Sequence, residues 1–298
     1  MSNALSAPAG NVKVKKLKHH SNIVSILIRL AENPMAIAGL VILLLLIFVA
    51  VFAPYLSPYQ YDKINIVDAY LSPSLQHPAG TDQLGRDILS RLMYGARYSL
   101  QIGIWSTLIG TIGGVLLGSI AGFFGKAVDE VVMRLLDVLQ SMPAMILNVA
   151  IASALGPGFT NCIIAISVSI VPRAARLIRA SILSIRDMEY IQAATITNCT
   201  TTKTIVKHLI PNALSSSIVQ ASMSIGGAIT AAAGLAYLGL GVQPPVPEWG
   251  AMLSEGRTYI RSNPYMCIFP GILIVITVLS LNLLGDGLRD ALDPKLKK

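Results

Sequence analysis

The sequence predicts an all-α membrane protein with six transmembrane helices and a polar helical hairpin between two of them. Of its 298 residues, 53% are hydrophobic and 13% are charged, whereas a soluble domain carries about 25% charged residues. The apolar residues gather in six stretches, each long enough to cross or nearly cross a hydrocarbon core about 30 Å thick. Residues 187–212 differ from their surroundings, because they are polar and mildly basic yet lie between two apolar stretches.

The first apolar stretch, residues 35–53, follows a basic segment and is bounded by Pro54 and Pro58. It is longer than the core of a cleaved signal peptide, so we expect a retained first span. Proline is expected to kink the third span at Pro143 and to interrupt the fourth at Pro172. The later spans are predicted at 98–122, 135–155, 161–180, 214–236 and 266–285, with loops at 54–97, 123–133 and 239–265.

This pattern divides the chain into four parts and fixes its orientation. The parts are an N-terminal tail with its lead-in (1–34), the first span with an outer loop (35–97), a core (98–288) that contains residues 187–212, and a C-terminal tail (289–298). Six spans place both termini on one side of the membrane. Of the 23 Lys and Arg residues, 17 fall on that side. Because cytoplasmic loops are rich in Lys and Arg, we expect both termini and the hairpin in the cytoplasm.

Four glycines recur every fourth residue in the second span and share one helix face: Gly110, Gly114, Gly118 and Gly122. Such a ridge lets a second helix approach closely, although glycine can also simply be tolerated in a span. The fourth span ends in three arginines spaced three residues apart, which we expect to anchor it at the interface: Arg173, Arg176 and Arg179. Asp137 is expected to pair with Arg134 or with backbone.

The polar hairpin is predicted to hold two short helices. Asp187 and Glu189 begin the first, where acidic residues favour the helix dipole. Two adjacent alanines, Ala193 and Ala194, leave a shallow surface that a partner can approach. Asn198 tolerates the left-handed conformation of a turn. The second helix runs over about 200–210 and is expected to end at Pro211. An ordinary cytoplasmic loop is the alternative.

The hairpin resembles the EAA loop of ABC-importer permease subunits. In that family a Glu-Ala-Ala triplet is followed by a glycine and then by Ile-x-Leu-Pro. Here the triplet is Gln192-Ala193-Ala194, Asn198 stands at the glycine position, and Pro211 closes the motif with its spacing intact. The sequence departs from the pattern at Gln192, Asn198 and His208.

Three further stretches, 80–97, 238–253 and 285–294, resemble the C-type permease of dipeptide, oligopeptide and nickel importers. The likeness covers residues 25–295 and implies a type I ABC importer permease fold in a bacterial or archaeal cytoplasmic membrane. It also implies a second permease subunit, two ATPase subunits that bind ATP and Mg, and an extracytoplasmic substrate-binding protein. The ATPase-docking residues carried over from the family are Glu189, Gln192, Ala193, Ala194, Asn198 and Pro211.

The sequence lacks features of other function classes. It has no G-x-x-x-x-G-K-[ST] phosphate loop; the nearest stretch, residues 122–127, has neither the first glycine nor the final Ser or Thr. We therefore expect that the subunit does not bind or hydrolyse ATP and holds no cofactor. The three cysteines, Cys162, Cys199 and Cys267, lie far apart, which argues against a disulfide framework or a metal site. The net charge of +8 points first to cytoplasmic loops rich in Lys and Arg, and only weakly to a nucleic acid partner.

The proline-rich outer loop 239–265 carries Glu248, Trp249 and Glu255. These residues are candidates for contact with the binding protein, and packing of the loop against its own bundle is an equal alternative. For the transported molecule, short peptides are the first expectation and nickel or a metal–chelator complex the second. A stand-alone secondary carrier is the alternative of another class, but the predicted spans lack the mid-membrane ionisable residues that such carriers use. A scaffold or channel-like subunit is the third possibility.

Overall fold

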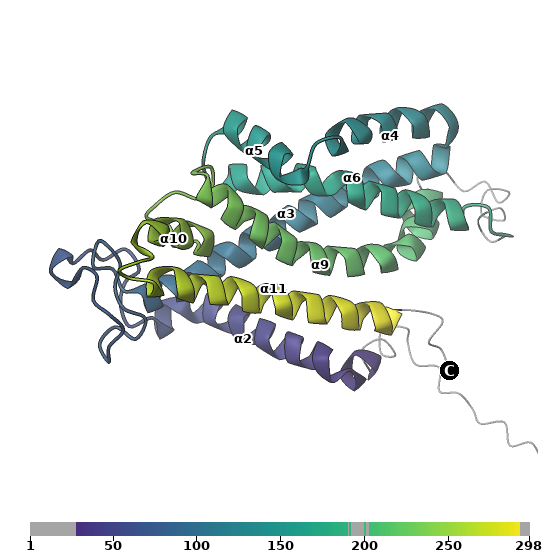
Figure 1. The fold of residues 1–298 in the computed structure, drawn as a ribbon. Coiled ribbons are helices and arrows are strands. Elements are labelled where there is room, and N and C mark those ends of the chain that lie inside the picture. The colour runs from purple at the N-terminus through teal and green to yellow at the C-terminus, as the bar shows by residue number, and fades with distance from the viewer. Residues whose placement is uncertain (1–27, 190, 192–199, 201–202, 293–298) are drawn as a thin grey trace, which may run out of the picture.

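The computed structural model describes residues 28–189, 191, 200 and 203–292, and it is helical over most of this length (Figure 1). No β-strand occurs among these residues, and Thr81 and Asp87 form one isolated antiparallel bridge. The helices are α2 (Pro34–Leu56), η1 (Ile66–Asp68), α3 (Ile88–Phe124), α4 (Lys126–Gln140), α5 (Ala144–Leu155), α6 (Phe159–Ile185), η2 (Thr204–Leu209), α9 (Ile210–Tyr237), α10 (Trp249–Gly256), η3 (Arg257–Tyr259) and α11 (Tyr265–Leu292).

Five helical segments in the described part are long and apolar enough to cross a membrane: α2, α3, α6, the continuous segment 204–237, and α11. The pair α4 and α5 makes a sixth crossing if its two halves are counted together. The predicted all-α membrane fold is therefore confirmed.

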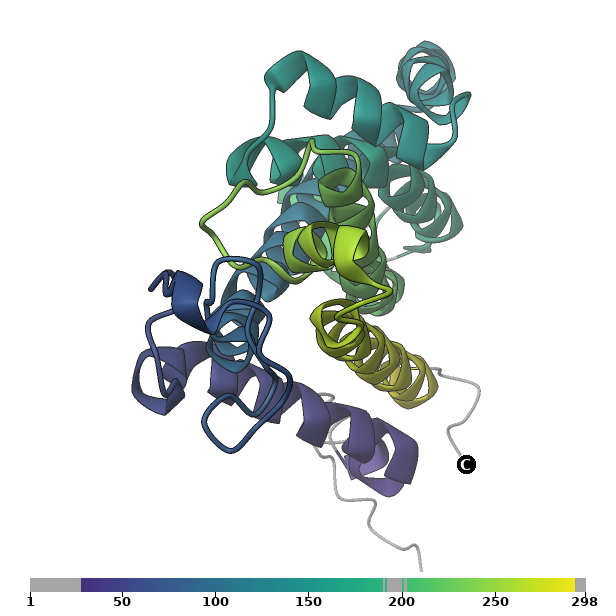
Figure 2. The same ribbon diagram turned by 60° about the vertical axis from the view of Figure 1, so that its left-hand side comes forward.

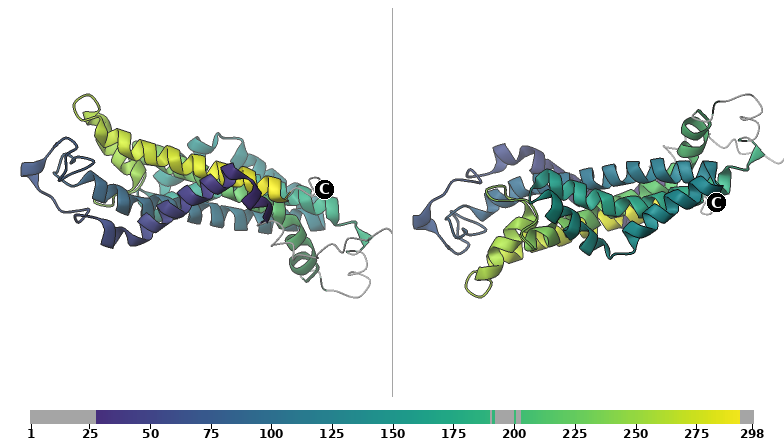
Figure 3. Two further views of the ribbon diagram at one scale, coloured as in Figure 1. Left: turned by 90° about the horizontal axis from the view of Figure 1, so that it is seen from below. Right: turned by 90° about the horizontal axis from the view of Figure 1, so that it is seen from above.

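The long helices run side by side in one elongated bundle (Figures 1 and 3). α2 packs along α11, and α3 packs along α6. The loop between α2 and α3 lies at one end of the bundle together with α10 (Figure 2). The first turn of α2, the last turn of α11 and η2 lie at the opposite end. This arrangement places η2, the described part of the second hairpin helix, at the same end as the two termini of the helical bundle.

The four-glycine ridge of α3 lies against α6. A Cβ atom added at Gly110 would lie 2.7 Å from Cβ of Ile170 and 2.8 Å from the carbonyl oxygen of Ser167. One added at Gly122 would lie 3.0 Å from a methyl carbon of Ile182. Gly114 and Gly118 meet the backbone of α6 between these two points. The ridge therefore brings two helix backbones closer together than any side chain would allow.

The predicted third span is not one helix. Residues 123–133, predicted as a loop, belong largely to α4, and the chain bends by 87° between α4 and α5. The expected kink at Pro143 is thus a full break, with Pro143 at the N-cap of α5. α4 was missed because it is amphipathic: its charged residues resemble a loop when only apolar run length is read.

Two ion pairs fasten α4 to α6. Asp129 binds Arg179 with both carboxylate oxygens at 2.5 Å, and Asp137 binds Arg176 at 2.5 Å. The prediction that Asp137 pairs with Arg134 or with backbone was therefore wrong. Residues three and four apart lie on one face of a helix, so the arginines of α6 and the acids of α4 meet along one seam.

Two other boundaries differ from the sequence prediction. Pro54 and Pro172 lie inside α2 and α6, and neither proline ends its helix. Pro54 stands in the last turn of α2, where a single missing hydrogen bond has a small effect, and Pro172 is buried in the bundle, where tertiary packing supports the helix. α3 begins at Ile88, so the predicted loop 54–97 is shorter by about ten residues. Asp87 caps α3 by accepting a hydrogen bond from the backbone of Ser90.

Candidate functional site

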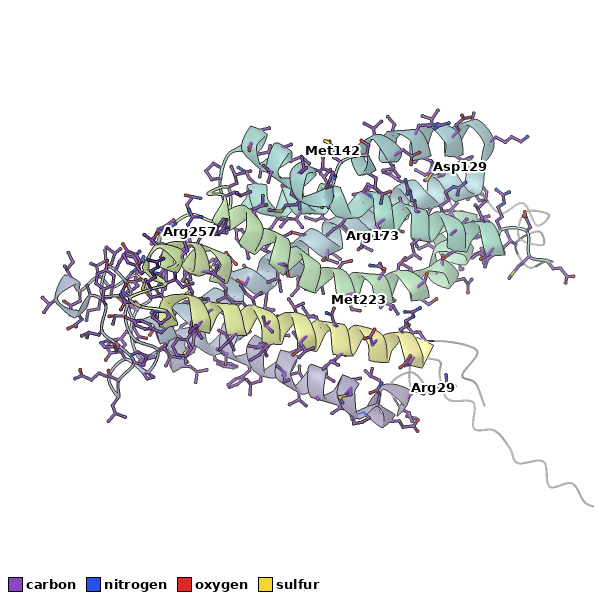
Figure 4. All side chains as sticks on the ribbon, in the orientation of Figure 1. Arg29, Asp129, Met142, Arg173, Met223 and Arg257 are labelled. Carbon is purple, nitrogen blue, oxygen red and sulfur yellow. The ribbon has the colours of Figure 1, made fainter. Side chains whose placement is uncertain are left out.

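A cavity of about 420 Å³ opens where α4 and α5 separate. Its walls come from that break, from the middle of α6 and from the middle of α9. Figure 4 shows Met142 at the break and Arg173 midway along α6. The volume lies within the range of about 300–1,000 Å³ that is typical of small-molecule sites.

The cavity contains polar groups that the described part of the chain does not satisfy. Oδ1 of Asn148 and Oγ of Ser217 are buried and have no hydrogen-bond partner among the described residues. Both residues are 3% exposed and line the cavity. Arg173 also lines it, is exposed, and forms no hydrogen bond or ion pair with any other described residue. Because buried polar groups are nearly always paired, this constellation indicates a site for a polar molecule.

Sequence reasoning placed Arg173 at the interface, where α6 was expected to leave the membrane. α6 continues to Ile185, so Arg173 lies about 18 Å from that end at 1.5 Å per residue. Asn148 was not singled out, although it is the one amide side chain in the apolar sequence of α5. That isolation is a usable signal, since polar residues inside membrane spans usually have a function. Ser217 follows two other serines, and its sequence context gave no such signal.

The described residues of the hairpin are anchored by an apolar cluster. Ile191 and Leu209 pack with Ile178 and Ile182 of α6 and with Ala213 of α9. All five are nearly inaccessible to solvent. This cluster connects the hairpin directly to two of the helices that line the cavity.

The second helix of the hairpin does not end at Pro211 as predicted. η2 is a π-helical turn that leads directly into α9, and Pro211 lies in the first turn of α9. The wide turn joins the backbone N–H of Ile210 to the carbonyl oxygen of Ile205. Because η2 and α9 form one continuous helical segment, Pro211 lies within a helical run, directly after the wide π turn.

The predicted docking residues are only partly visible in the structure. Glu189 and Pro211 are exposed. Lys203 and Lys207 are exposed close to them. The remaining candidates lie outside the described residues: Gln192, Ala193, Ala194 and Asn198.

At the opposite end of the bundle, a buried charge cluster ties the loop between α2 and α3 to helices α3 and α10. Nε of Arg86 binds Asp82 at 2.6 Å, and its Nη2 binds Glu255 at 3.1 Å. Arg91 binds Glu255 at 3.0 Å and also contacts Asp82. Beside them His77 binds Asp87, the cap of α3, at 2.9 Å. Glu255 therefore forms its ion pairs within its own chain, where it connects α10 to Arg86 and Arg91.

Glu248 and Trp249 are also buried inside the chain, which leaves neither side chain accessible to a binding protein. Glu248 caps α10 by accepting hydrogen bonds from Ala251 N–H and Ser99 Oγ, both at 2.8 Å. Burial raises the pKa of its carboxyl, and these hydrogen bonds oppose the shift. Nε1 of Trp249 donates to the carbonyl oxygen of Leu92 at 2.9 Å. The sequence left two alternatives for loop 239–265: contact with the binding protein, or packing against its own bundle. The structure shows Glu248 and Trp249 packed against the bundle.

Within the described residues, no group of three or more His, Cys, Asp or Glu side chains could hold a metal ion. The candidate site has two parts, the cavity and the apolar cluster of Ile178, Ile182, Ile191, Leu209 and Ala213. On α9 the two parts are one helical turn apart.

Comparison with known proteins identifies the family. Residues 114–298, more than half of the chain, match the family described as the inner membrane component of binding-protein-dependent transport systems. This chain belongs to that family. Residues 21–73 of the permease also match the N-terminal transmembrane domain of oligopeptide transport permease C.

Several curated relatives cover nearly the whole permease. It is 44% identical to the dipeptide transport system permease protein DppC of Alkalihalophilus pseudofirmus, over 90% of this chain and 88% of the relative. It is 43% identical to the di/tripeptide permease protein DppC of Pseudomonas aeruginosa, over 90% of each chain. It is 42% identical to the glutathione permease protein GsiD of Pectobacterium atrosepticum, again over 90% of each. The resemblance to C-type importer permeases is confirmed.

Solved structures support the fold. A chain of the inward-facing MetNI methionine ABC transporter superimposes with a TM-score of 0.56 at 21% identity, covering 68% of the permease and 97% of that chain. A chain of an amino acid ABC transporter gives 0.53 at 16% identity, covering 67% and 92%. The permease is a multi-pass inner membrane protein.

Proposed function

We propose that this permease forms half of the translocation pathway of an ATP-driven importer of short peptides. The observation that carries the proposal is identity of 42–44% over about nine-tenths of relatives named for dipeptides, di/tripeptides and glutathione. These names favour peptides over nickel. The cavity between α5, α6 and α9, with Asn148, Arg173 and Ser217 in its wall, fits a pathway for such molecules.

In this proposal the rest of the importer comprises a second permease, two ATPase subunits and an extracytoplasmic binding protein. The hairpin 187–212 and both termini face the cytoplasm, and the hairpin docks on one ATPase. ATP and Mg bind only to the ATPases, because this chain has no phosphate loop. ATP binding acts on transport through its differential effect on two states of the permease.

The proposal is tested by purifying the tagged chain with its neighbouring subunits and reconstituting the complex in liposomes with the binding protein. The expected result is co-purification of a second permease and two ATPases, and uptake of a labelled dipeptide that requires ATP. The matched control carries ATPase subunits that bind ATP but do not hydrolyse it. Uptake that continued in this control would instead support a secondary carrier.

A further inference from the structure

The charge that lines the cavity is positive. Arg173 is the one charged side chain among the residues that line it, and no acidic residue is among them. The neighbouring arginines of α6, Arg176 and Arg179, are neutralised by Asp137 and Asp129. Arg173 therefore offers an unpaired guanidinium to whatever enters.

Arg173 is exposed at the wall of the cavity, so its guanidinium can be reached by a molecule that enters. Its planar fork of N–H donors matches the two oxygens of a carboxylate. Asn148 and Ser217 add a buried carbonyl oxygen and a buried hydroxyl, neither of which has a partner in the part of the chain that the structure describes. Such groups pair with the N–H and C=O of peptide bonds. A short peptide presents both kinds of group: one terminal carboxylate and at least one amide.

We propose that this cavity is a peptide subsite in which Arg173 binds the C-terminal carboxylate and Asn148 and Ser217 hydrogen-bond the adjacent peptide group. The inference rests on the proposed function and specifies which end of the peptide this subunit binds. This permease receives the carboxyl end of the peptide, and the terminal ammonium finds no acidic partner on its side of the cavity. Because a translocation site must release its cargo, the contact is expected to be weak.

The test compares a dipeptide with the C-terminal amide of the same dipeptide. Initial uptake rates are measured in liposomes that contain the complete complex and binding protein, for the wild type, Arg173→Gln, Arg173→Lys and Arg176→Gln. The preference of the binding protein for either compound is the same in every variant, so it cancels when the rate ratios are compared. Arg176→Gln is the matched control, because it removes the same charge three residues away outside the cavity.

The expected result is that Arg173→Gln lowers the ratio of acid to amide uptake about tenfold, which corresponds to about 1.4 kcal/mol. Arg173→Lys should retain part of the preference, and Arg176→Gln should leave it unchanged. Asn148→Leu should slow uptake of both compounds by the same factor, about fivefold, since both carry the amide. If the binding protein rejects the amide, the same ratio is measured as binding of both compounds to the purified complex by equilibrium dialysis.

An unchanged ratio of acid to amide uptake in Arg173→Gln would overturn the subsite. An equal fall of both rates in that variant is the signature of a structural role, and no fall in either rate means that Arg173 does not contact the cargo. In both cases ATP-dependent peptide uptake by the wild type would leave the proposed function intact. Absence of ATP-dependent uptake for every peptide in the wild type would contradict the proposed function itself.

Discussion

The contact between α3 and α6 allows a quantitative test of the packing that supports the cavity. Gly110→Ala places a Cβ atom 2.8 Å from the carbonyl oxygen of Ser167, whereas ordinary contact begins near 3.4 Å. The two helices must therefore separate by about 0.6 Å. A gap of this size loses about a quarter or more of the dispersion energy of the atoms along it.

Overpacking of this kind typically costs about 1–3 kcal/mol. Replacing a helical glycine by alanine returns about 0.5–1 kcal/mol through lower backbone entropy. The net expectation is a destabilisation of about 1 kcal/mol, within a range of about 0–2.5 kcal/mol. For a chain of 298 residues, 1 kcal/mol corresponds to a fall in melting temperature of about 2 °C. Melting of the detergent-purified permease, followed by intrinsic fluorescence, measures this shift.

Gly113→Ala is the matched control, because it lies on the same helix and its added Cβ meets only a methyl carbon of Val171 at 3.2 Å. A side-chain methyl can move by a few tenths of an ångström, so this variant should melt at or slightly above the wild-type temperature. The reasoning is refuted if Gly110→Ala melts as high as Gly113→Ala. In that case the helix backbones would not be in the close contact described.

Three further expectations concern the hairpin and the outer loop. Ala193→Glu should weaken co-purification of the ATPases about tenfold while membrane insertion is unchanged, and full coupling and uptake would contradict docking at Ala193. Arg91→Ala leaves Asp82 and Glu255 with one cation fewer in a buried cluster, so it should destabilise the permease by about 3–5 kcal/mol; Arg91→Lys should melt between this variant and the wild type. Because the pKa of Glu248 is raised in the folded state, its contribution to stability is fully present below the ordinary pKa and is lost as pH rises through the raised value. Melting temperatures at pH 5 and 8 should differ less in Glu248→Gln, and an equal difference would contradict the raised pKa.

The sequence predicted the number and approximate position of the spans because apolar run length follows directly from the thickness of the bilayer. It did not predict the break between α4 and α5. The charged residues of α4 form ion pairs with α6, and a partner 40 or 50 residues away is invisible in a local pattern. One proline was similarly misjudged: Pro211 was taken as the end of the second hairpin helix, but the helical segment continues through it after the wide turn of η2.

The candidate site was predicted unevenly for the same reason. The hairpin has a local signature of spacing and polarity, so the resemblance could be recognised from residues 192–211 alone. The cavity has no local signature. It brings together Asn148, Arg173 and Ser217, which lie on three helices, and only the bend between α4 and α5 leaves room among them. Glu248 and Trp249 looked accessible in a proline-rich loop, yet their hydrogen bonds to α3 bury them.

The position of the apolar cluster under the hairpin gives a physical route from the hairpin end of the bundle to the cavity. On α6, Ile178 belongs to the cluster and the adjacent Leu177 lines the cavity. On α9, Ala213 belongs to the cluster and Ser217, one turn or about 6 Å further, lines the cavity. A force applied to the hairpin thus acts on the same two rigid helices that carry Arg173 and Ser217. Because close-packed helices shift as units and do not deform continuously, a displacement of the hairpin must change the spacing of these two side chains. If the hairpin docks on an ATPase as proposed, α6 and α9 are the path by which a displacement of Ile191 and Leu209 can reach the cavity.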